Sequence, residues 1–167
     1  MRVHETLTLP LSANEAAAMY ADPAYAEIRR DTLGANDATS SVDGDPAGAF
    51  TVRTELVLPT DRAPEVARRF VGSRLTVHEE QSWSAPAGDG SRTGRNRLEV
   101  AGMPAGIEAA VRLIPAGDDS CTLDIDGDLT AKVPLIGGRL EKAALPYISS
   151  VLKVEQKAAA TYRERRV

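Results

Sequence analysis

The chain has 167 residues, of which 43% are apolar and 26% charged, and we expect one domain with a buried core over residues 1–167. Its net charge of −4 argues against a nucleic-acid partner, which would need a basic face. The single cysteine, Cys121, excludes an internal disulfide and a cysteine-based metal site, and no run of eighteen apolar residues offers a transmembrane segment.

The N-terminal part predicts one strand and two helices. Residues 2–9 alternate between apolar and polar side chains, which indicates a strand. No apolar leader precedes this strand, so we expect a cytoplasmic protein. The spacing of Ser12 and Glu15 is that of a capping box at a helix start. A second helix should begin at Pro23, where proline costs no hydrogen bond, and end at Gly34.

Six further strands are predicted in the middle of the chain. A short helical segment over residues 65–71 interrupts them. Consecutive strands joined by short turns pair antiparallel. With helices grouped after the first strand and at the end, the expected class is α+β, with the helices on one face of a curved sheet. These six strands cover residues 35–45, 51–58, 74–83, 93–101, 105–115 and 120–133.

The last part of the chain predicts a long amphipathic helix. The Gly137-Gly138 pair lets the chain turn out of the last strand, and a helical pattern then runs from Leu140 almost to the C-terminus. Pro146 removes one intrahelical hydrogen bond, so we expect a kink, or a break near Lys142. The apolar arc of this helix consists of Ala144, Tyr147, Val151, Val154, Ala158 and Tyr162.

Glu155 falls at the edge of this apolar arc. A carboxylate buried there without a partner would be costly. The first interpretation is that it pairs with an arginine or reaches solvent at the sheet edge. Contact with a ligand is the second interpretation.

The order of these elements resembles that of the START/SRPBCC superfamily, the helix-grip fold, and the resemblance covers essentially the whole chain. Its most specific motif is the hinge Pro-Leu-Ile-Gly-Gly-Arg-Leu-Glu at residues 134–141. Weaker support comes from residues 2–9 with Ala-Asp-Pro at 21–23, and from Arg-Arg-Phe-Val-Gly at 68–72 before a strand that ends in Trp83. More narrowly, the chain looks like an uncharacterised bacterial branch, a domain-of-unknown-function family.

This resemblance implies a sheet of about seven antiparallel strands wrapped around the C-terminal helix, with a cavity between them. Superfamily members bind lipids, sterols, polyketides or plant hormones, and some are cyclases, dehydratases or co-chaperone domains. The fold therefore indicates where a ligand would lie, and not what happens to it.

The polar residues of the predicted sheet give little sign of catalysis. Strand alternation points His78 away from the apolar face. Asp124, Asp126 and Asp128 share one face of the last strand, but the oxygen ligands of a Ca²⁺ ion must converge rather than line up. We therefore assign no metal, no cofactor and no catalytic residue.

Two other carboxyls, those of Glu5 and Glu79, fall in rows that should face inward. Either could line a pocket, although a local bulge or an exposed sheet edge would turn it to solvent. An enzyme would need at least two polar groups that converge inside the pocket. The best available set is Glu155 with Tyr147 or Tyr162.

The inner face of the predicted sheet is apolar, and only seven aromatic residues are available to fill the space beneath the last helix. We therefore expect a cavity that binds a hydrophobic or amphipathic small molecule, lipid-like or polyketide-like, in a monomer or weak homodimer. The alternatives are a cyclase or dehydratase acting on an apolar substrate and a co-chaperone-like interaction module. The expected ligand-binding residues are Val52, Leu56, Val77, Trp83, Leu98, Met103, Val111, Leu113, Tyr147, Val151 and Glu155.

Overall fold

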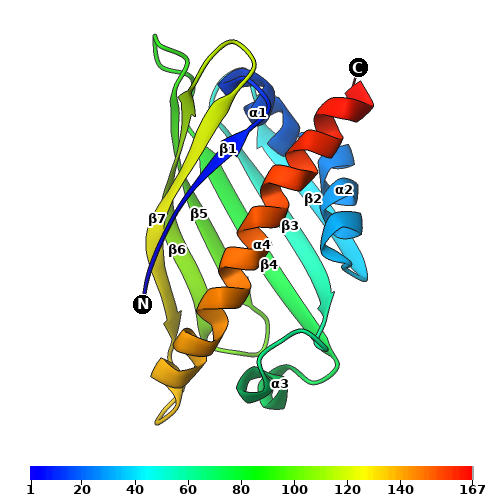
Figure 1. The fold of residues 1–167 in the computed structure, drawn as a ribbon, viewed down its shortest axis with the longest axis vertical. Helices are drawn as coiled ribbons and strands as arrows, with labels where there is room; N and C mark the ends of the chain where they lie inside the picture. The colour runs from blue at the N-terminus through cyan, green and yellow to red at the C-terminus, as the bar shows by residue number, and fades with distance from the viewer. Residues whose placement is uncertain (167) are drawn as a thin grey trace.

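The computed structural model describes residues 1–166, which form one seven-stranded antiparallel sheet and four helices (Figure 1). The strands lie in the order β1-β7-β6-β5-β4-β3-β2, so only β1 and β7 pair without being neighbours in sequence. The strands are β1 Arg2–Leu9, β2 Asp37–Gly44, β3 Phe50–Pro59, β4 Arg74–Trp83, β5 Arg92–Val100, β6 Ala105–Pro115 and β7 Cys121–Ala131. The helices are α1 Ala13–Tyr20, α2 Pro23–Leu33, α3 Glu65–Val71 and α4 Gly137–Arg166.

This is the helix-grip fold of the α+β class, as the sequence predicts. Figure 1 shows α4 crossing one face of the sheet diagonally, with α1 and α2 near its C-terminal half and α3 at the opposite end. The sheet curves around α4 because its inner face is apolar and must be covered. Every predicted strand is present, with ends that shift by at most two residues.

The caps of the first two helices form as their sequences predict. The Ser12 hydroxyl accepts a hydrogen bond from the Glu15 amide at 3.2 Å, and the Glu15 carboxylate accepts one from the Ser12 amide at 2.9 Å. This reciprocal pair satisfies two amides that the helix leaves free. At the end of α2, Gly34 adopts a left-handed conformation with φ 67°, which glycine reaches without strain.

The expectation of a helix break near Lys142 is wrong, because α4 runs unbroken from Gly137 to Arg166. Pro146 and Lys142 both lie on the exposed side of the helix, where water can satisfy the Lys142 carbonyl that lacks its usual donor. The glycine pair also lies inside α4 rather than in the turn before it. Leu135 makes the turn instead, with φ 70° and a fully exposed side chain.

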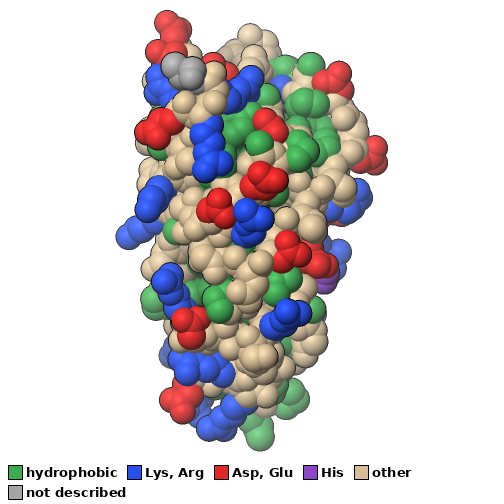
Figure 2. Space-filling view, turned by 90° about the vertical axis from the view of Figure 1, so that its right-hand side faces the viewer, with side chains coloured by type: hydrophobic (Ala, Val, Ile, Leu, Met, Phe, Trp, Pro, Cys, Tyr) green, Lys and Arg blue, Asp and Glu red, His purple; other side chains and the backbone are tan. Residues whose placement is uncertain are grey.

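The outer surface carries charges of both signs. On the face shown in Figure 2, basic and acidic side chains are interspersed rather than gathered by sign. Across residues 1–166, no helix has the length and apolar character needed to span a bilayer.

Candidate ligand-binding site

A cavity of about 220 Å³ lies between the inner face of the sheet and residues 140–155 of α4. Strands β3 to β7 supply most of its walls, and the α3 region closes one end. Residues from α4 that line it recur at helical spacing: Leu140, Ala144, Tyr147, Val151 and Glu155. The recurrence shows that one stripe of the helix faces the cavity over about four turns.

Side-chain size explains why this space stays open. The cavity-facing stripe of α4 includes the small residue Ala144, and β6 contributes Ala109 opposite. At the other end of the groove, α1 and α2 insert large side chains such as Tyr20, Tyr25 and Ile28 into the main core. The cavity is bordered on this side by Tyr20 of α1 and by Arg29 and Leu33 of α2.

Trp83 forms the wall between the packed core and the cavity, since it belongs to the core and also lines the cavity. Its ring stacks on Tyr20 at a centroid distance of 5.7 Å. Gly94 lies opposite it in register, and a β-carbon there would approach the indole to 2.9 Å. A glycine at this position leaves room for the indole ring.

Most of the residues expected to contact a ligand line this cavity. They are Leu56, Val77, Trp83, Leu98, Met103, Val111, Tyr147, Val151 and Glu155. Val52 and Leu113 do not: both lie in the packed core. Strand alternation gives the inward face correctly but cannot tell which part of that face a helix covers.

One end of the cavity carries a buried polar cluster of Arg29, Glu79, Glu155, Asn96 and Gln81. The Arg29 guanidinium donates to the Glu79 carboxylate at 2.7 Å (Nη1 to Oε2), and its Nε lies 3.7 Å from Glu155 Oε2. The other Glu79 oxygen accepts from Asn96 at 2.9 Å and from Gln81 at 3.1 Å. All five residues line the cavity, so one arginine and two carboxyls meet its apolar interior.

The two carboxyls experience opposite electrostatic environments. Burial alone would raise the pKa of Glu79, but Arg29 and the amides of Asn96 and Gln81 stabilise its charge and lower that pKa below the usual value. Burial raises the pKa of Glu155, and the more distant Arg29 offsets this only in part, while Glu79 raises it further. Glu79 therefore pairs with Arg29 as an ionised carboxylate. Glu155 is the carboxyl that holds its proton to higher pH.

The sequence interpretation found part of this cluster. Glu79 was expected to face inward, and Glu155 to pair with an arginine or to contact a ligand. The structure gives Glu155 an arginine neighbour, and that arginine is buried rather than at the surface. Arg29 was missed because its partner lies fifty residues away in sequence. Asn96 was also missed, although it lies two residues from the inward-facing Leu98.

The tyrosines proposed as partners of Glu155 do not converge on it. Tyr162 donates its hydroxyl to Asp22 at 2.8 Å, and Tyr147 lines the cavity without belonging to the polar cluster. The nearer hydroxyl is that of Tyr25, which favours the charged form of Glu155 although it makes no hydrogen bond of standard geometry.

The family described as "Protein of unknown function (DUF2505)" matches this chain over residues 4–162, nearly its whole length. The chain belongs to this family. Among curated proteins, none matches this DUF2505 sequence.

Solved structures similar to this DUF2505 protein share its fold at low sequence identity. An aromatase/cyclase from Streptomyces is 13% identical, with a TM-score of 0.63 over 99% of this chain and 94% of that one. A START superfamily protein from Mycobacterium smegmatis is 17% identical, with a TM-score of 0.57 over 96% and 98%. Norcoclaurine synthase from Thalictrum flavum, bound to a transition-state analogue, is 15% identical, with a TM-score of 0.55 over 100% and 96%. These likenesses confirm the helix-grip fold.

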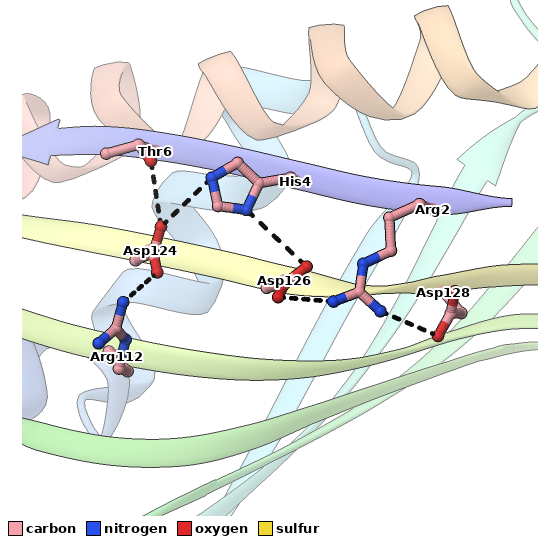
Figure 3. Close-up of polar contacts among 7 residues, drawn as sticks. All are labelled: Arg2, His4, Thr6, Arg112, Asp124, Asp126 and Asp128. Carbon is pink, nitrogen blue, oxygen red and sulfur yellow. Dashed lines mark hydrogen bonds and ion pairs between the residues drawn. The ribbon is translucent and has the colours of Figure 1, made fainter.

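The carboxylates of β7 in this DUF2505 protein lie on the outer face of the sheet (Figure 3), and none of them lines the cavity. Arg2 contacts Asp126 at 2.7 Å and Asp128 at 3.6 Å, and Arg112 contacts Asp124 at 2.7 Å. The hydrogen bond from Arg112 is the main cause that lowers the pKa of Asp124. Each aspartate is therefore paired across the strands.

The remaining polar candidates are also accounted for. His78 is exposed and lies 3.4 Å from Glu55 on the neighbouring strand, on the outer face as predicted. Glu5 is half-buried and accepts a hydrogen bond from the Ser149 hydroxyl at 2.8 Å. It ties β1 to α4 and does not line the cavity.

Proposed function

We propose that this protein binds a small hydrophobic or amphipathic molecule in the cavity beneath α4. The observation that carries the proposal is the cavity itself, about 220 Å³ in volume and apolar except at the Arg29 cluster and at Glu141. Ligand pockets commonly combine apolar walls with a few convergent polar groups. The ligand would place its apolar body against β3 to β7 and its polar end toward Glu155.

The volume limits the class of ligand. An engineered cavity of about 150 Å³ binds benzene, and pockets for drug-sized molecules hold about 300–1,000 Å³. A cavity of about 220 Å³ fits a single ring with one or two short substituents, or a short branched chain. A whole sterol or phospholipid would need α3 or α4 to move.

Direct binding measurements test this proposal. Native mass spectrometry of gently purified protein should show a bound small molecule, and calorimetric titration with toluene should show saturable binding. The fluorescence of Trp83 provides a second signal for binding, because this residue is the only tryptophan of the chain and lines the cavity.

A pair of variants shows whether the bound molecule occupies this cavity. Ala144→Phe fills part of it and should abolish toluene binding. The neighbouring Ala143 does not line the cavity, so Ala143→Phe should retain binding. The proposal fails if the wild-type protein binds neither a co-purified molecule nor toluene.

The alternative, a cyclase or dehydratase, draws support from Glu155. A carboxyl with a raised pKa inside an apolar site is suited to act as a general acid. The test is incubation with a small cyclic β-hydroxy ketone, with mass spectrometry used to detect loss of one water. Turnover that disappears in Glu155→Gln would favour the enzyme, whereas binding without turnover would favour the carrier.

A further inference from the structure

Two polar atoms of the Arg29 cluster, Arg29 Nε and Asn96 Oδ1, are buried without a hydrogen-bond partner in the described part of the chain. Both belong to residues that line the cavity. The carboxyl of Glu155 lines it as well, and its contact with Arg29 Nε, at 3.7 Å, is longer than a hydrogen bond. A buried polar atom left without a partner is unfavourable because it has lost its water, so a ligand that supplies a partner would be favoured.

We infer that the ligand carries a hydroxyl group, alcoholic or phenolic, which donates a hydrogen bond to Glu155 and accepts one from Arg29 Nε. This inference rests on the proposed function, since it assigns the polar end of the same ligand. The separation of the two atoms fits this arrangement: one oxygen can lie at about 2.9 Å from both of two atoms that are 3.7 Å apart.

The charges of the cluster favour a hydroxyl over the other common polar groups. A ligand ammonium would have to lie against the Arg29 guanidinium, and a ligand carboxylate against Glu155 and the ionised Glu79. Like charges at such distances repel strongly in a buried site. A hydroxyl is neutral and is both donor and acceptor, so it can pair with Glu155 in either protonation state.

The charged and titratable groups around Glu155 come from three elements. Arg29 and Tyr25 face it from α2, Glu79 from β4 and Tyr20 from α1. Burial, together with the nearby Glu155, raises the pKa values of both tyrosines well above their usual range. Both phenols stay neutral, so Arg29 remains the one cation of the cluster that a ligand meets.

Two probes of nearly the same shape test the inference. Para-cresol and para-xylene differ by a hydroxyl in place of a methyl group, and each is a single ring that suits a cavity of about 220 Å³. Without a partner for its hydroxyl, para-cresol should bind more weakly than para-xylene, because the hydroxyl loses water on entry. With Glu155 and Arg29 as partners, wild-type protein should bind para-cresol about 10-fold more tightly or better, as measured by calorimetry.

Variants at position 155 identify the partner. Glu155→Leu should reverse the preference in favour of para-xylene, whereas Glu155→Gln keeps an acceptor oxygen and should keep most of the preference for para-cresol. Glu164 lies on the exposed side of the same helix, so Glu164→Gln is the matched control and should leave the ratio of the two affinities unchanged.

The outcomes separate the two proposals. If neither probe binds, the proposed binding function itself fails. If para-xylene binds wild-type protein as tightly as para-cresol, the cavity binds apolar molecules and the hydroxyl inference is overturned. The wild-type ratio requires no variant, so this result stands even if Glu155→Leu fails to fold.

Discussion

The two ends of the groove beneath α4 are built from the same sheet and the same helix, yet one is filled and the other hollow. At the filled end, five of the seven aromatic side chains belong to one core: Tyr20, Tyr25, Phe50, Trp83 and Tyr162. At the hollow end only Tyr147 remains, since Phe70 is exposed. The difference lies in how few bulky residues the chain has and where it places them.

The filled end is also fixed by contacts that do not depend on its apolar core. Buried Arg92 donates to the backbone carbonyls of Gly48, Ser84 and Pro46, which joins two loops to β5. At the other end, α3 buries none of its residues and has no side-chain cap. With fewer buried contacts, the hollow end should open locally more easily than the filled end.

The largest effect should come from removing the arginine at the boundary between the two ends. Arg29→Met leaves Glu79 and Glu155 buried with no cation between them. Breaking a buried pair in this way costs about 3–5 kcal/mol of unfolding free energy, measurable by urea denaturation. Part of the loss should be recovered in acid, where both carboxyls take up protons.

The adjacent residue supplies the control for this variant. Arg30 is more exposed and pairs with Asp31, so Arg30→Met should change the unfolding free energy by less than about 1 kcal/mol. A similarly small loss for Arg29→Met would mean that water reaches the Arg29 cluster. The cluster would then not form a buried boundary between the filled and hollow ends.

A matched pair of leucines tests the contrast between the ends directly. Leu113 is fully buried in the filled core, and Leu56, also buried, lines the cavity. Leu113→Ala should cost about 2–5 kcal/mol. Leu56→Ala should cost at least about 1 kcal/mol less, because a side chain beside a void has already lost contacts on one side.

Chemical denaturation of both leucine variants checks this prediction. Equal losses would show that the hollow end is packed in solution as tightly as the filled end. In that case the cavity would be an unsuitable basis for the proposed function.

The sequence predicts the fold well and the site only in part, for a physical reason. Strand alternation and the prolines and glycines that end elements are local signals, so β1, β4, β6 and α3 agree in their ends with the prediction. Whether an inward residue such as Leu113 or Leu98 meets a helix or a void depends on elements far away in sequence. The pair of Arg29 with Glu79 likewise joins α2 to β4, and no spacing rule relates them.

The raised pKa of Glu155 predicts a smaller effect, which depends on pH. Between its ordinary value of 4.5 and the raised value, the folded protein holds a proton that the unfolded chain has released. Stability therefore falls as the pH rises through this window and stays lower above it. Glu155→Gln cannot titrate, so its stability relative to wild type should be greater near neutral pH than at pH values close to 4.5.

Parallel denaturation curves at acidic and neutral pH measure this difference, with Glu164→Gln as the exposed control on the same helix. If Glu155→Gln and wild type differed by the same amount at every pH, Glu155 would titrate like a solvated carboxyl. The opposite pKa shifts of Glu79 and Glu155 would then not hold in solution.

The smallest effect should come from α3, the element that closes the hollow end. Phe70 is 40% exposed although it is a large aromatic residue, so Phe70→Ser should change the unfolding free energy by less than about 0.5 kcal/mol. Amide hydrogen exchange should be fast in α3 and slow in α1 and the C-terminal half of α4, since local opening is easiest where few apolar contacts must break. Slow exchange in α3 would mean that both ends are equally rigid, and a ligand would then have to enter elsewhere.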